Sequence, residues 1–255
     1  MNAPHPLFQA LWDKVAAGQR LAALTAYDYP MARLLDEAGI DLLLVGDSLG
    51  MVVLGYPDTT SVTLPEMIHH TKAVARGRQK AVLVSDLPYR SYETPEQALG
   101  SARQLLEAGA DAVKLEGGLE KIEIVEHLTS HGIPLVGHIG MLPQKIQEEG
   151  RYRKKGRTPE GRARILADAQ ALQRAGVGLI VVESVLKRFG SELAATLTTP
   201  LLGIGAGPDT AGQILVLHDL LGASPWFVPP FATPRAQLAQ EVTRAVKEFR
   251  ESLTR

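Results

Sequence analysis

A short segment recurs three times in this chain: an Ala-Gly pair, a run of apolar residues and then an acidic residue. The three copies are Ala38-Gly39 to Asp47, Ala108-Gly109 to Glu116 and Ala175-Gly176 to Glu183. Glycine is common just after a helix, and an apolar run of this length is typical of a buried strand. Each copy therefore predicts a helix end, a buried strand and a carboxylate where that strand leaves the core. A fourth apolar run, without the Ala-Gly pair, ends on Asp86.

Strand-like and helix-like segments alternate along the whole chain, which favours a parallel sheet covered by helices. Eight such units in 255 residues predict an α/β protein of the (β/α)8 TIM barrel class, with a doubly wound open sheet as the alternative. No linker or low-complexity segment interrupts the chain, so we expect a single domain over residues 1–255. The predicted strands are Leu21–Ala26, Asp41–Gly46, Ala81–Asp86, Ala112–Glu116, Pro134–His138, Leu179–Glu183, Pro200–Gly205 and Trp226–Val228.

The clearest helical patterns are Leu64–Arg76, Thr94–Ala108 and Thr158–Ala175. Thr94-Pro-Glu-Gln97 has the pattern of a capping box with proline at the first helical position. Thr233-Pro-Arg predicts the start of a last helix, Thr233–Leu253. A short amphipathic helix at Pro6–Ala17 precedes the first strand, and we expect it to close the lower end of the barrel.

Composition excludes several classes of protein. A net charge of −1 gives no reason to expect a nucleic-acid partner, and no apolar run is long enough to span a membrane. The chain has no cysteine, which excludes disulfides and thiolate metal sites and is consistent with a reducing compartment. The N-terminal residues lack the pattern of a signal peptide, so we expect a cytoplasmic protein.

Polar residues collect where the predicted strands end, which is where the active sites of barrels lie. They include Asp47, Ser48, Asp86, Lys114, Glu116, His138 and Glu183. Strand alternation puts Lys114 and Glu116 on one face, with Val113 and Leu115 on the other. Four carboxylates at one rim repel each other unless a cation or a proton holds them. Oxygen ligands without cysteine favour Mg²⁺ over Zn²⁺.

Each of these residues also has a structural explanation when taken singly. Asp47 and Asp86 could cap turns or helices, Lys114 could pair with Glu116, and His138 could be a packed or loop histidine. Two loops also allow two interpretations each. The glycine-rich segment Gly203–Gly207 could cradle a phosphate or form a tight turn, and the mostly basic loop Gln147–Arg157 could be a solvated lid or attract an anionic substrate.

Seven short motifs occur in the order and at the intervals of a known family. They are Thr25-Ala-Tyr-Asp-Tyr29, Val45-Gly-Asp-Ser-Leu-Gly-Met51, Ser85-Asp-Leu-Pro88, Lys114-Leu-Glu-Gly-Gly118, Gly137-His-Ile-Gly140, Val182-Glu183 and Gly203-Ile-Gly-Ala-Gly207. Together with Gly212-Gln-Ile-Leu-Val-Leu-His-Asp219 they make the chain resemble the 3-methyl-2-oxobutanoate hydroxymethyltransferases, also called ketopantoate hydroxymethyltransferases. The resemblance covers about Leu21 to Phe231.

This resemblance implies a (β/α)8 barrel, a Mg²⁺ ion and a homo-oligomer, typically a decamer. It implies transfer of a one-carbon unit from 5,10-methylenetetrahydrofolate to 3-methyl-2-oxobutanoate, which gives 2-dehydropantoate in pantothenate biosynthesis. By motif position, Asp47, Asp86 and Glu116 correspond to metal-linked carboxylates and Glu183 to the proton acceptor. Asp47, Ser48, Asp86 and Lys114 correspond to the oxo-acid contacts.

The chain departs from the family pattern in two places. Ala211 stands where an acidic residue is usual, and Glu149–Arg157 differs from the usual Gly-Gly-Tyr-Lys-Val-Gln-Gly-Arg. A related barrel, such as a phosphoenolpyruvate mutase or an isocitrate-lyase-type enzyme, could use the same rim. The chain lacks the cysteine-containing loop of those enzymes. A non-catalytic scaffold would require the acids at the strand ends to be coincidental.

The predicted chemistry assigns a part to each strand-end residue. Glu183 would remove the C3 proton of the oxo acid, with its pKa raised by the apolar side chains of Ile180, Val181 and Val182. Lys114 would offset negative charge on substrate and enolate, and His138 could donate a hydrogen bond to the oxo acid.

Overall fold

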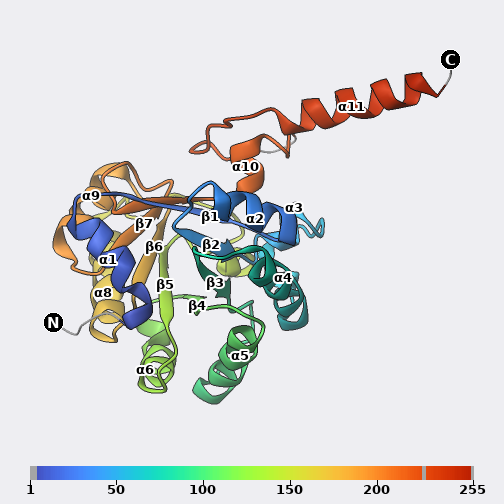
Figure 1. Cartoon of the computed structure of the whole chain (residues 1–255). Helices are drawn as coiled ribbons and strands as arrows, with labels where there is room; N and C mark the ends of the chain where they lie inside the picture. Colours follow the sequence, from blue (N-terminus) through green and yellow to red (C-terminus); the bar gives the residue numbers. More distant parts are fainter. Residues whose placement is uncertain (1–4, 226–227, 254–255) are drawn as a thin grey trace. The chain divides into compact units, whose positions relative to one another are not determined.

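A computed structural model describes residues 5–225 and 228–253. Its eight described strands pair in parallel, each with the next along the chain, and close into a barrel. Helices surround the strands (Figure 1), so the (β/α)8 prediction is confirmed. The strands are β1 Leu21–Thr25, β2 Leu42–Val45, β3 Val82–Asp86, β4 Ala112–Glu116, β5 Leu135–Gly140, β6 Leu179–Glu183, β7 Leu201–Ile204 and β8 Gly212–Leu215.

The helices lie mostly in the connections between strands. The α-helices are α1 Gln9–Ala16, α2 Tyr29–Glu37, α3 Leu49–Val52, α4 Leu64–Gly77, α5 Pro95–Glu107, α6 Ile122–Ser130, α7 Ile146–Glu149, α8 Pro159–Arg174, α9 Lys187–Thr196, α10 Leu217–Leu221 and α11 Leu238–Ser252. Four 3-10 turns are also present in the described residues: η1 Pro6–Phe8, η2 Thr59–Ser61, η3 Leu119–Lys121 and η4 Pro143–Lys145. The three helices with the clearest sequence patterns are confirmed as α4, α5 and α8.

Alternation along the strands divides the buried apolar residues into two layers. On β6, Leu179 and Val181 belong to the cluster that fills the barrel. Ile180 and Val182 belong to the larger cluster between the strands and the helices. Because successive side chains of a strand point to opposite faces, each strand supplies both layers. The polar residue at the end of a strand therefore points either into the barrel or toward the helices, according to its position in this alternation.

The N-terminal helix closes the lower end of the barrel, as predicted. Phe8 is fully buried and joins Leu11 in the cluster inside the barrel. The indole N–H of Trp12 donates to the carbonyl oxygen of Gly178, at 2.8 Å, just before β6. A Cβ at Gly178 would lie 2.0 Å from the Phe8 ring, so only glycine leaves room for that ring. Here the third copy of the repeat has glycine where the first two have Asp41 and Asp111.

The eighth strand lies at Gly212–Leu215, which corrects the prediction of Trp226–Val228. Val228 is not in a strand, and the rest of that predicted segment lies outside the described residues. The true strand pairs with β7 and meets β1 through the N–H of Leu21, which donates to the Ala211 carbonyl at 2.9 Å. A Cβ at Gly212 would approach the Leu21 carbonyl oxygen to 2.3 Å, so close backbone packing selects this segment.

Two predictions about helix starts need correction. The last helix begins at Leu238 rather than Thr233. At α5, the N–H of Gln97 donates to the Thr94 hydroxyl, but the Gln97 side chain accepts from the N–H of Glu93, so the reciprocal bond of a capping box is not formed. A complete capping box stands instead at α4, between Thr63 and Glu66.

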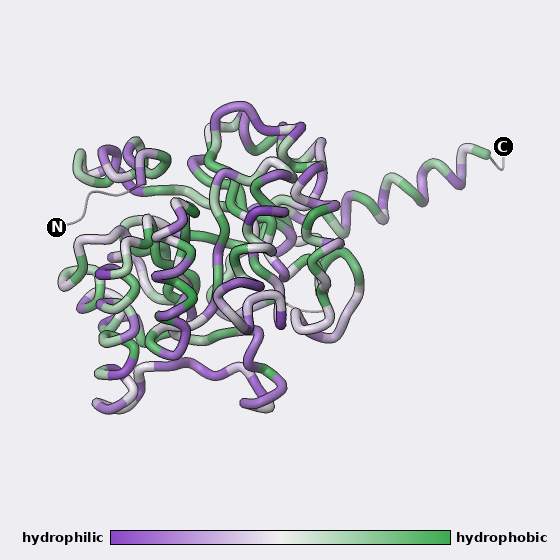
Figure 2. Tube along the Cα trace, turned by 90° about the horizontal axis from the view of Figure 1, so that it is seen from below, coloured by the Kyte–Doolittle hydropathy of each residue, from purple (hydrophilic) through white to green (hydrophobic). Residues whose placement is uncertain are grey.

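The chain divides into two compact units, Met1–Ile214 and Leu215–Arg255. The first holds nearly all of the barrel, and the single domain predicted over residues 1–255 stays a prediction. In the second unit, α11 alternates polar and apolar residues along its length (Figure 2). The helices of the described chain include none with the length and apolar character needed to cross a membrane.

Candidate active site

The strand register brings the predicted site residues to the upper, carboxyl-terminal rim of the barrel. Asp86 on β3 is the register partner of Lys114 on β4, and Glu116 on β4 is the register partner of His138 on β5. Glu183 ends β6 beside Gly140. All of these side chains, with Asp47 just after β2, are buried. Val113 and Leu115 belong to the outer cluster, so Lys114 and Glu116 share the inner face as predicted.

Asp47 and Asp86 form a close acidic pair. The backbone N–H of Asp47 donates to Oδ2 of Asp86 at 3.1 Å. Burial, followed by repulsion from Asp86, raises the pKa of Asp47 to about 7. Burial also raises the pKa of Asp86, although Lys114 partly opposes this change. Two carboxyl groups this close tend to share a proton or a cation.

Lys114 is the counter-ion of this pair. Its Nζ lies 2.9 Å from Oδ1 of Asp86. Burial alone would lower the pKa of Lys114, but the charges of Asp86, Glu116 and Asp47 raise it above its ordinary value. The lysine is therefore charged at neutral pH, and its ion pair is with Asp86 rather than with Glu116. A buried ammonium group in this position can offset negative charge on a bound anion.

His138 lies between Lys114 and two glutamates. Its Nδ1 is 3.3 Å from Lys114 Nζ and 3.6 Å from Glu116 Oε1, and its Nε2 is 3.3 Å from Glu183 Oε2. Burial and then the Lys114 charge lower the pKa of His138 well below its usual range, so the ring is neutral. Because the ammonium group only donates, we assign Nδ1 as the acceptor and place the ring proton on Nε2, toward Glu183.

Glu183 has the properties of a general base. Its pKa is raised to about 8, first by burial and then by repulsion from Asp47 and Asp86, which Lys114 opposes. The predicted direction is confirmed, but the predicted cause is only partly right. Ile180 and Val182 belong to the outer cluster and face the helices, whereas Val181 belongs to the cluster inside the barrel.

The backbone next to Glu183 is held in an unusual conformation. Ser184 has a φ of +47°, which is rare for a residue other than glycine. The Ser184 N–H donates to the Ile204 carbonyl at 2.8 Å, and the Glu183 carbonyl accepts from the N–H of Met141 at 2.9 Å. Strained backbone of this kind persists where surrounding bonds enforce it, and it is common at active sites. Here it turns the chain sharply directly after Glu183.

Ser48 follows Asp47 at the same rim. Its hydroxyl lies 2.9 Å from the hydroxyl of Tyr27, which comes just after β1. Both residues belong to motifs that the sequence singled out, and the structure joins them.

Sequence reasoning missed two buried residues at this site, Gln144 and Tyr92. The Gln144 side chain donates to Asp47 Oδ2 at 2.8 Å, and its backbone N–H donates to Glu116 Oε2 at 3.0 Å. The Tyr92 hydroxyl donates to Oε1 of Gln144. Neither residue ends a strand, so the pattern that found the acids could not find them. Only a weak indication of Gln144 was present in the sequence: Pro143 directly before it is typical of the start of a helical turn, here soon after β5.

The donor set fits a hard divalent cation. Asp47, Asp86 and Glu116 offer buried carboxylate oxygens, and Asp86 Oδ1 contacts Lys114 but makes no hydrogen bond. In residues 5–225 and 228–253, no three acidic or histidine side chains are grouped so as to hold a metal ion. Mg²⁺ is commonly bound by one or two carboxylates, with substrate and water oxygens completing the shell. Asp47 and Asp86 match that pattern.

The basic loop is anchored beside Glu183, through a hydrogen bond to the next residue. The Lys155 N–H donates to the Ser184 carbonyl at 2.8 Å, and the Leu186 N–H donates to the Lys155 carbonyl at 3.3 Å. Burial and then the charges of Asp58 and Asp47 raise the pKa of Tyr152 to about 12. The side chains of Arg151, Arg153 and Lys154 are exposed. The loop thus brings positive charge close to the acidic rim.

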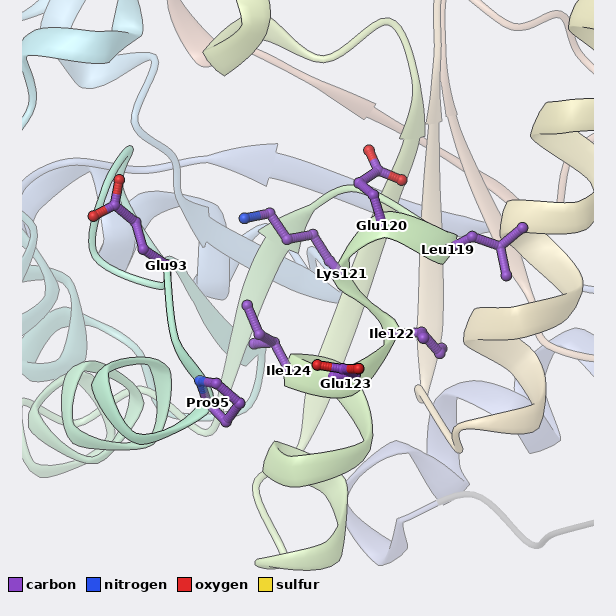
Figure 3. A pocket seen from close by; sticks show the side chains of 8 residues that line it. All are labelled: Glu93, Pro95, Leu119, Glu120, Lys121, Ile122, Glu123 and Ile124. Carbon is purple, nitrogen blue, oxygen red and sulfur yellow. The ribbon is translucent and has the colours of Figure 1, made fainter.

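A cavity of about 320 Å³ lies beside the starts of α5 and α6, in the connections that follow β3 and β4. Figure 3 shows the Lys121 side chain extending toward the loop that carries Glu93. The residues that line the cavity are Glu93, Pro95, Leu119, Glu120, Lys121, Ile122, Glu123 and Ile124. None of the strand-end residues lines it, so the chemistry is argued from the rim and not from this cavity.

Sequence comparison shows which known proteins the chain is similar to. The sequence model of ketopantoate hydroxymethyltransferase matches residues 7–255. A 3-methyl-2-oxobutanoate hydroxymethyltransferase of Trichodesmium erythraeum is 52% identical over 91% of this chain and 89% of that protein. The enzymes of that name from Thermus thermophilus and Ignicoccus hospitalis are 50% and 48% identical, over 93% and 95% of this chain and 93% and 92% of those proteins.

Solved structures with the same architecture are more distant. A phosphonopyruvate hydrolase in complex with oxalate and Mg²⁺ has a TM-score of 0.65 at 16% identity, over 86% of this chain and 83% of that one. A 2,3-dimethylmalate lyase has a TM-score of 0.63 at 17% identity, over 97% and 87%. These likenesses show the fold alone. Fold and site define an α/β-barrel enzyme with an acidic rim. By the sequence matches, the chain belongs to the ketopantoate hydroxymethyltransferase family, and it is a transferase.

Proposed function

We propose that this enzyme transfers a hydroxymethyl group from 5,10-methylenetetrahydrofolate to 3-methyl-2-oxobutanoate and so forms 2-dehydropantoate. One observation carries the chemical part of the proposal. Glu183, a buried carboxyl group with a pKa of about 8, shares a rim with the Asp47–Asp86 pair and Lys114. A base of that pKa beside a cation-binding acidic pair suits proton removal from the carbon next to a carbonyl group.

Asp47 and Asp86 would hold Mg²⁺, and the Glu116 carboxylate remains a further predicted ligand. The bound ion would supply positive charge to the carboxylate and keto oxygens of the oxo acid and stabilise the enolate. The buried carboxylate oxygens of the pair support this role, since they are the ligand type that Mg²⁺ prefers.

The remaining steps belong to residues of the chain. Glu183 takes the C3 proton, and the electron pair of that C–H bond moves into the C2–C3 bond and onto the keto oxygen. Lys114 balances the negative charge, and His138, whose buried Nε2 makes no hydrogen bond within the described residues, would donate one to the oxo acid. Ser48 would donate to the oxo-acid carboxylate. The folate would supply the one-carbon unit: water would replace the two C–N bonds of its methylene group, which releases tetrahydrofolate and formaldehyde. The enolate carbon would then add to the formaldehyde carbon, whose oxygen takes up a proton and becomes the new hydroxyl group.

Isotope exchange tests the proposal. In heavy water with MgCl₂ and no folate, the enzyme should exchange the C3 proton of 3-methyl-2-oxobutanoate, followed by NMR. An enzyme of the phosphoenolpyruvate mutase type or a non-catalytic scaffold would leave that proton in place. Absence of exchange at any pH from 6 to 9 would therefore overturn the proposal.

The exposed apolar residues of α11 in the second unit support the predicted homo-oligomer, for which we propose a decamer. The apolar side chains of this helix repeat every three or four residues and are exposed: Leu238, Val242, Val246 and Phe249. An apolar stripe along a helix normally packs against another surface. Light scattering at micromolar concentration tests this: a particle of 27.5 kDa, the mass of one chain, would contradict it. The cytoplasmic location also stays a prediction, tested by cell fractionation.

A further inference from the structure

Gln144 contacts residues at the ends of three different strands, and two of these residues are acids. Its Nε2 donates to Asp47 Oδ2 at 2.8 Å and to the Leu87 carbonyl at 3.1 Å. Its backbone N–H donates to Glu116 Oε2 at 3.0 Å. Asp47 follows β2, Leu87 follows β3 and Glu116 ends β4, while Gln144 itself lies in η4 after β5. One residue thus ties four neighbouring strand ends together.

The orientation of the Gln144 amide is determined by its partners. The amide oxygen can only accept a hydrogen bond, and it receives one from the buried Tyr92 hydroxyl. With the oxygen turned toward Tyr92, both N–H groups must face Asp47 and the Leu87 carbonyl. A flipped amide would place its oxygen against the Asp47 carboxylate and the Leu87 carbonyl, neither of which can donate in the ionised site. The Leu87 carbonyl therefore fixes the amide in the orientation that serves Asp47, and the Tyr92 hydroxyl donates to the oxygen that remains.

We propose that Gln144 is a positioning residue for the divalent cation, because its side chain holds the Asp47 carboxylate in the orientation that binds the ion. This inference rests on the proposed function, because it requires that the rim bind Mg²⁺. The hydrogen bonds of the Gln144 side chain support this role. Every hydrogen-bonding group of the side chain is satisfied within the barrel rim, and one goes to a carboxylate. A residue needed only to fill space would cost less as an apolar side chain of the same size.

Outer-shell hydrogen bonds of this kind orient metal ligands, and their removal commonly costs about 10- to 100-fold in metal affinity. Gln144→Met keeps the volume and loses all side-chain bonds. Gln144→Glu keeps the shape and can still accept from Tyr92, but it offers Asp47 a second carboxylate in place of a donor. Tyr92→Phe leaves the amide present but removes the hydrogen bond to its oxygen.

The matched control is Gln97→Met. Gln97 is exposed, donates to the Arg90 carbonyl at 2.9 Å and accepts from the Glu93 N–H at 2.8 Å, so it also makes two side-chain bonds. Neither bond reaches an acid of the rim. Its loss should disturb the start of α5 without touching Asp47 or Glu116.

The experiment is calorimetric titration of MgCl₂ into each full-length protein with saturating 3-methyl-2-oxobutanoate. We expect Gln144→Met and Gln144→Glu to raise the Kd for Mg²⁺ about 10- to 100-fold, Tyr92→Phe to raise it less, and Gln97→Met to leave it unchanged. In exchange assays, the Mg²⁺ concentration for half-maximal rate should rise more than the rate at saturating Mg²⁺ falls. Circular dichroism verifies folding, and if Gln144→Met does not fold, Tyr92→Phe decides by the same titration.

Two results would overturn the inference, and they are distinguishable. Tight binding by wild type with an unchanged Kd in the folded Gln144 and Tyr92 variants removes the positioning role but leaves the proposed function standing. Wild type that shows no Mg²⁺ binding removes the metal site itself and this inference with it. An equal loss in Gln97→Met would show that the effect is a general one of lost hydrogen bonds, and it would likewise overturn the assignment.

Discussion

At the lower end of the barrel, each acid has partners of its own. Asp41 accepts the N–H of Ala22 from β1 at 2.8 Å and pairs with Lys14 at 2.6 Å. Asp111 accepts the N–H of Leu83 from β3 at 2.9 Å and pairs with Arg78 at 2.6 Å. Both aspartates follow an Ala-Gly pair by two residues. The first half of the sequence repeat therefore forms the same arrangement twice: an aspartate that accepts a strand N–H and pairs with a basic side chain.

At the upper end, four buried carboxyl groups share a single buried lysine. Asp47, Asp86, Glu116 and Glu183 all have raised pKa values, chiefly because burial disfavours their charged forms. The same strands thus carry satisfied acids at one end and crowded acids at the other. In barrel enzymes, stability is typically served by the lower end and chemistry by the upper end. The contrast supports the proposal that the upper acids are arranged for a ligand at a cost in stability.

The largest effect should come from the acidic pair. Asp47→Ala and Asp86→Ala should each abolish divalent-ion-dependent turnover while the fold survives, because each removes half of the predicted cation site. Turnover with and without MgCl₂ measures the effect, and circular dichroism verifies the fold. Asp41→Ala, at the lower end, should reduce stability but keep Mg²⁺ dependence. If the Asp47 and Asp86 variants both kept full Mg²⁺-dependent turnover, the contrast between the ends would fail.

Next is the base. Glu183→Gln should slow C3–H exchange by roughly 10²–10⁴, the usual contribution of a positioned general base, while oxo-acid and Mg²⁺ binding persist. The amide has nearly the same shape, so packing should be preserved. Exchange is measured by NMR in heavy water, with Asp111→Asn as a lower-end control that should exchange at the wild-type rate. Wild-type exchange in Glu183→Gln would point to His138 as the base.

The lower end should show the opposite pattern. Phe8→Ala should destabilise the protein by about 3–5 kcal/mol, since a fully buried aromatic side chain is lost from the barrel floor. Urea unfolding followed by circular dichroism measures the loss. Exchange per folded molecule should stay at the wild-type value. A large drop in that specific rate would show that the floor and the rim are coupled, and that the two ends are less separate than proposed.

The pH profile of exchange sharpens the comparison. Glu183 acts as a base only when ionised, so the rate should fall about tenfold for each pH unit below its pKa. That pKa is about 8 when no cation is bound, and a bound cation should lower it by favouring the charged form. Raising MgCl₂ should therefore move the inflection to lower pH. A profile flat from pH 5 to 9 would exclude Glu183 as the titrating base.

The smallest effect should be a change in thermal stability when the charge of Asp47 is removed. The pKa of Asp47 is raised from 3.8 to about 7 on folding, so its unfavourable contribution is absent below about pH 3.8 and complete once the pH has risen through about 7. Without divalent ions at pH 8, Asp47→Asn should raise the Tm by about 2–4 °C per kcal/mol of relieved strain. Asp41→Asn should lower it. Thermal melts in EDTA compare the two, and a lowered Tm in Asp47→Asn would contradict the assignment.

Local pattern was enough to predict most of the fold. Seven of the strands lie where apolar runs predicted them, because a buried strand needs a continuous apolar segment. The eighth failed for the same reason. The true strand, Gly212-Gln-Ile-Leu215, is short and partly polar, and close packing of its backbone against Leu21 selects it. The predicted segment Trp226–Val228 is more apolar. Its residue Val228 is not in a strand, and the rest of it lies outside the described residues.

By itself, the sequence determined which residues stand at strand ends, since alternation and run length are local properties. The predicted site residues Asp47, Ser48, Asp86, Lys114, Glu116, His138 and Glu183 follow from that rule and from the family motifs. Only the tertiary structure decided the partners. Barrel register pairs Lys114 with Asp86 rather than Glu116, and a turn after β5 brings Gln144 to Asp47, 97 residues away in sequence. Such contacts depend on how strands close in three dimensions, which no local pattern encodes.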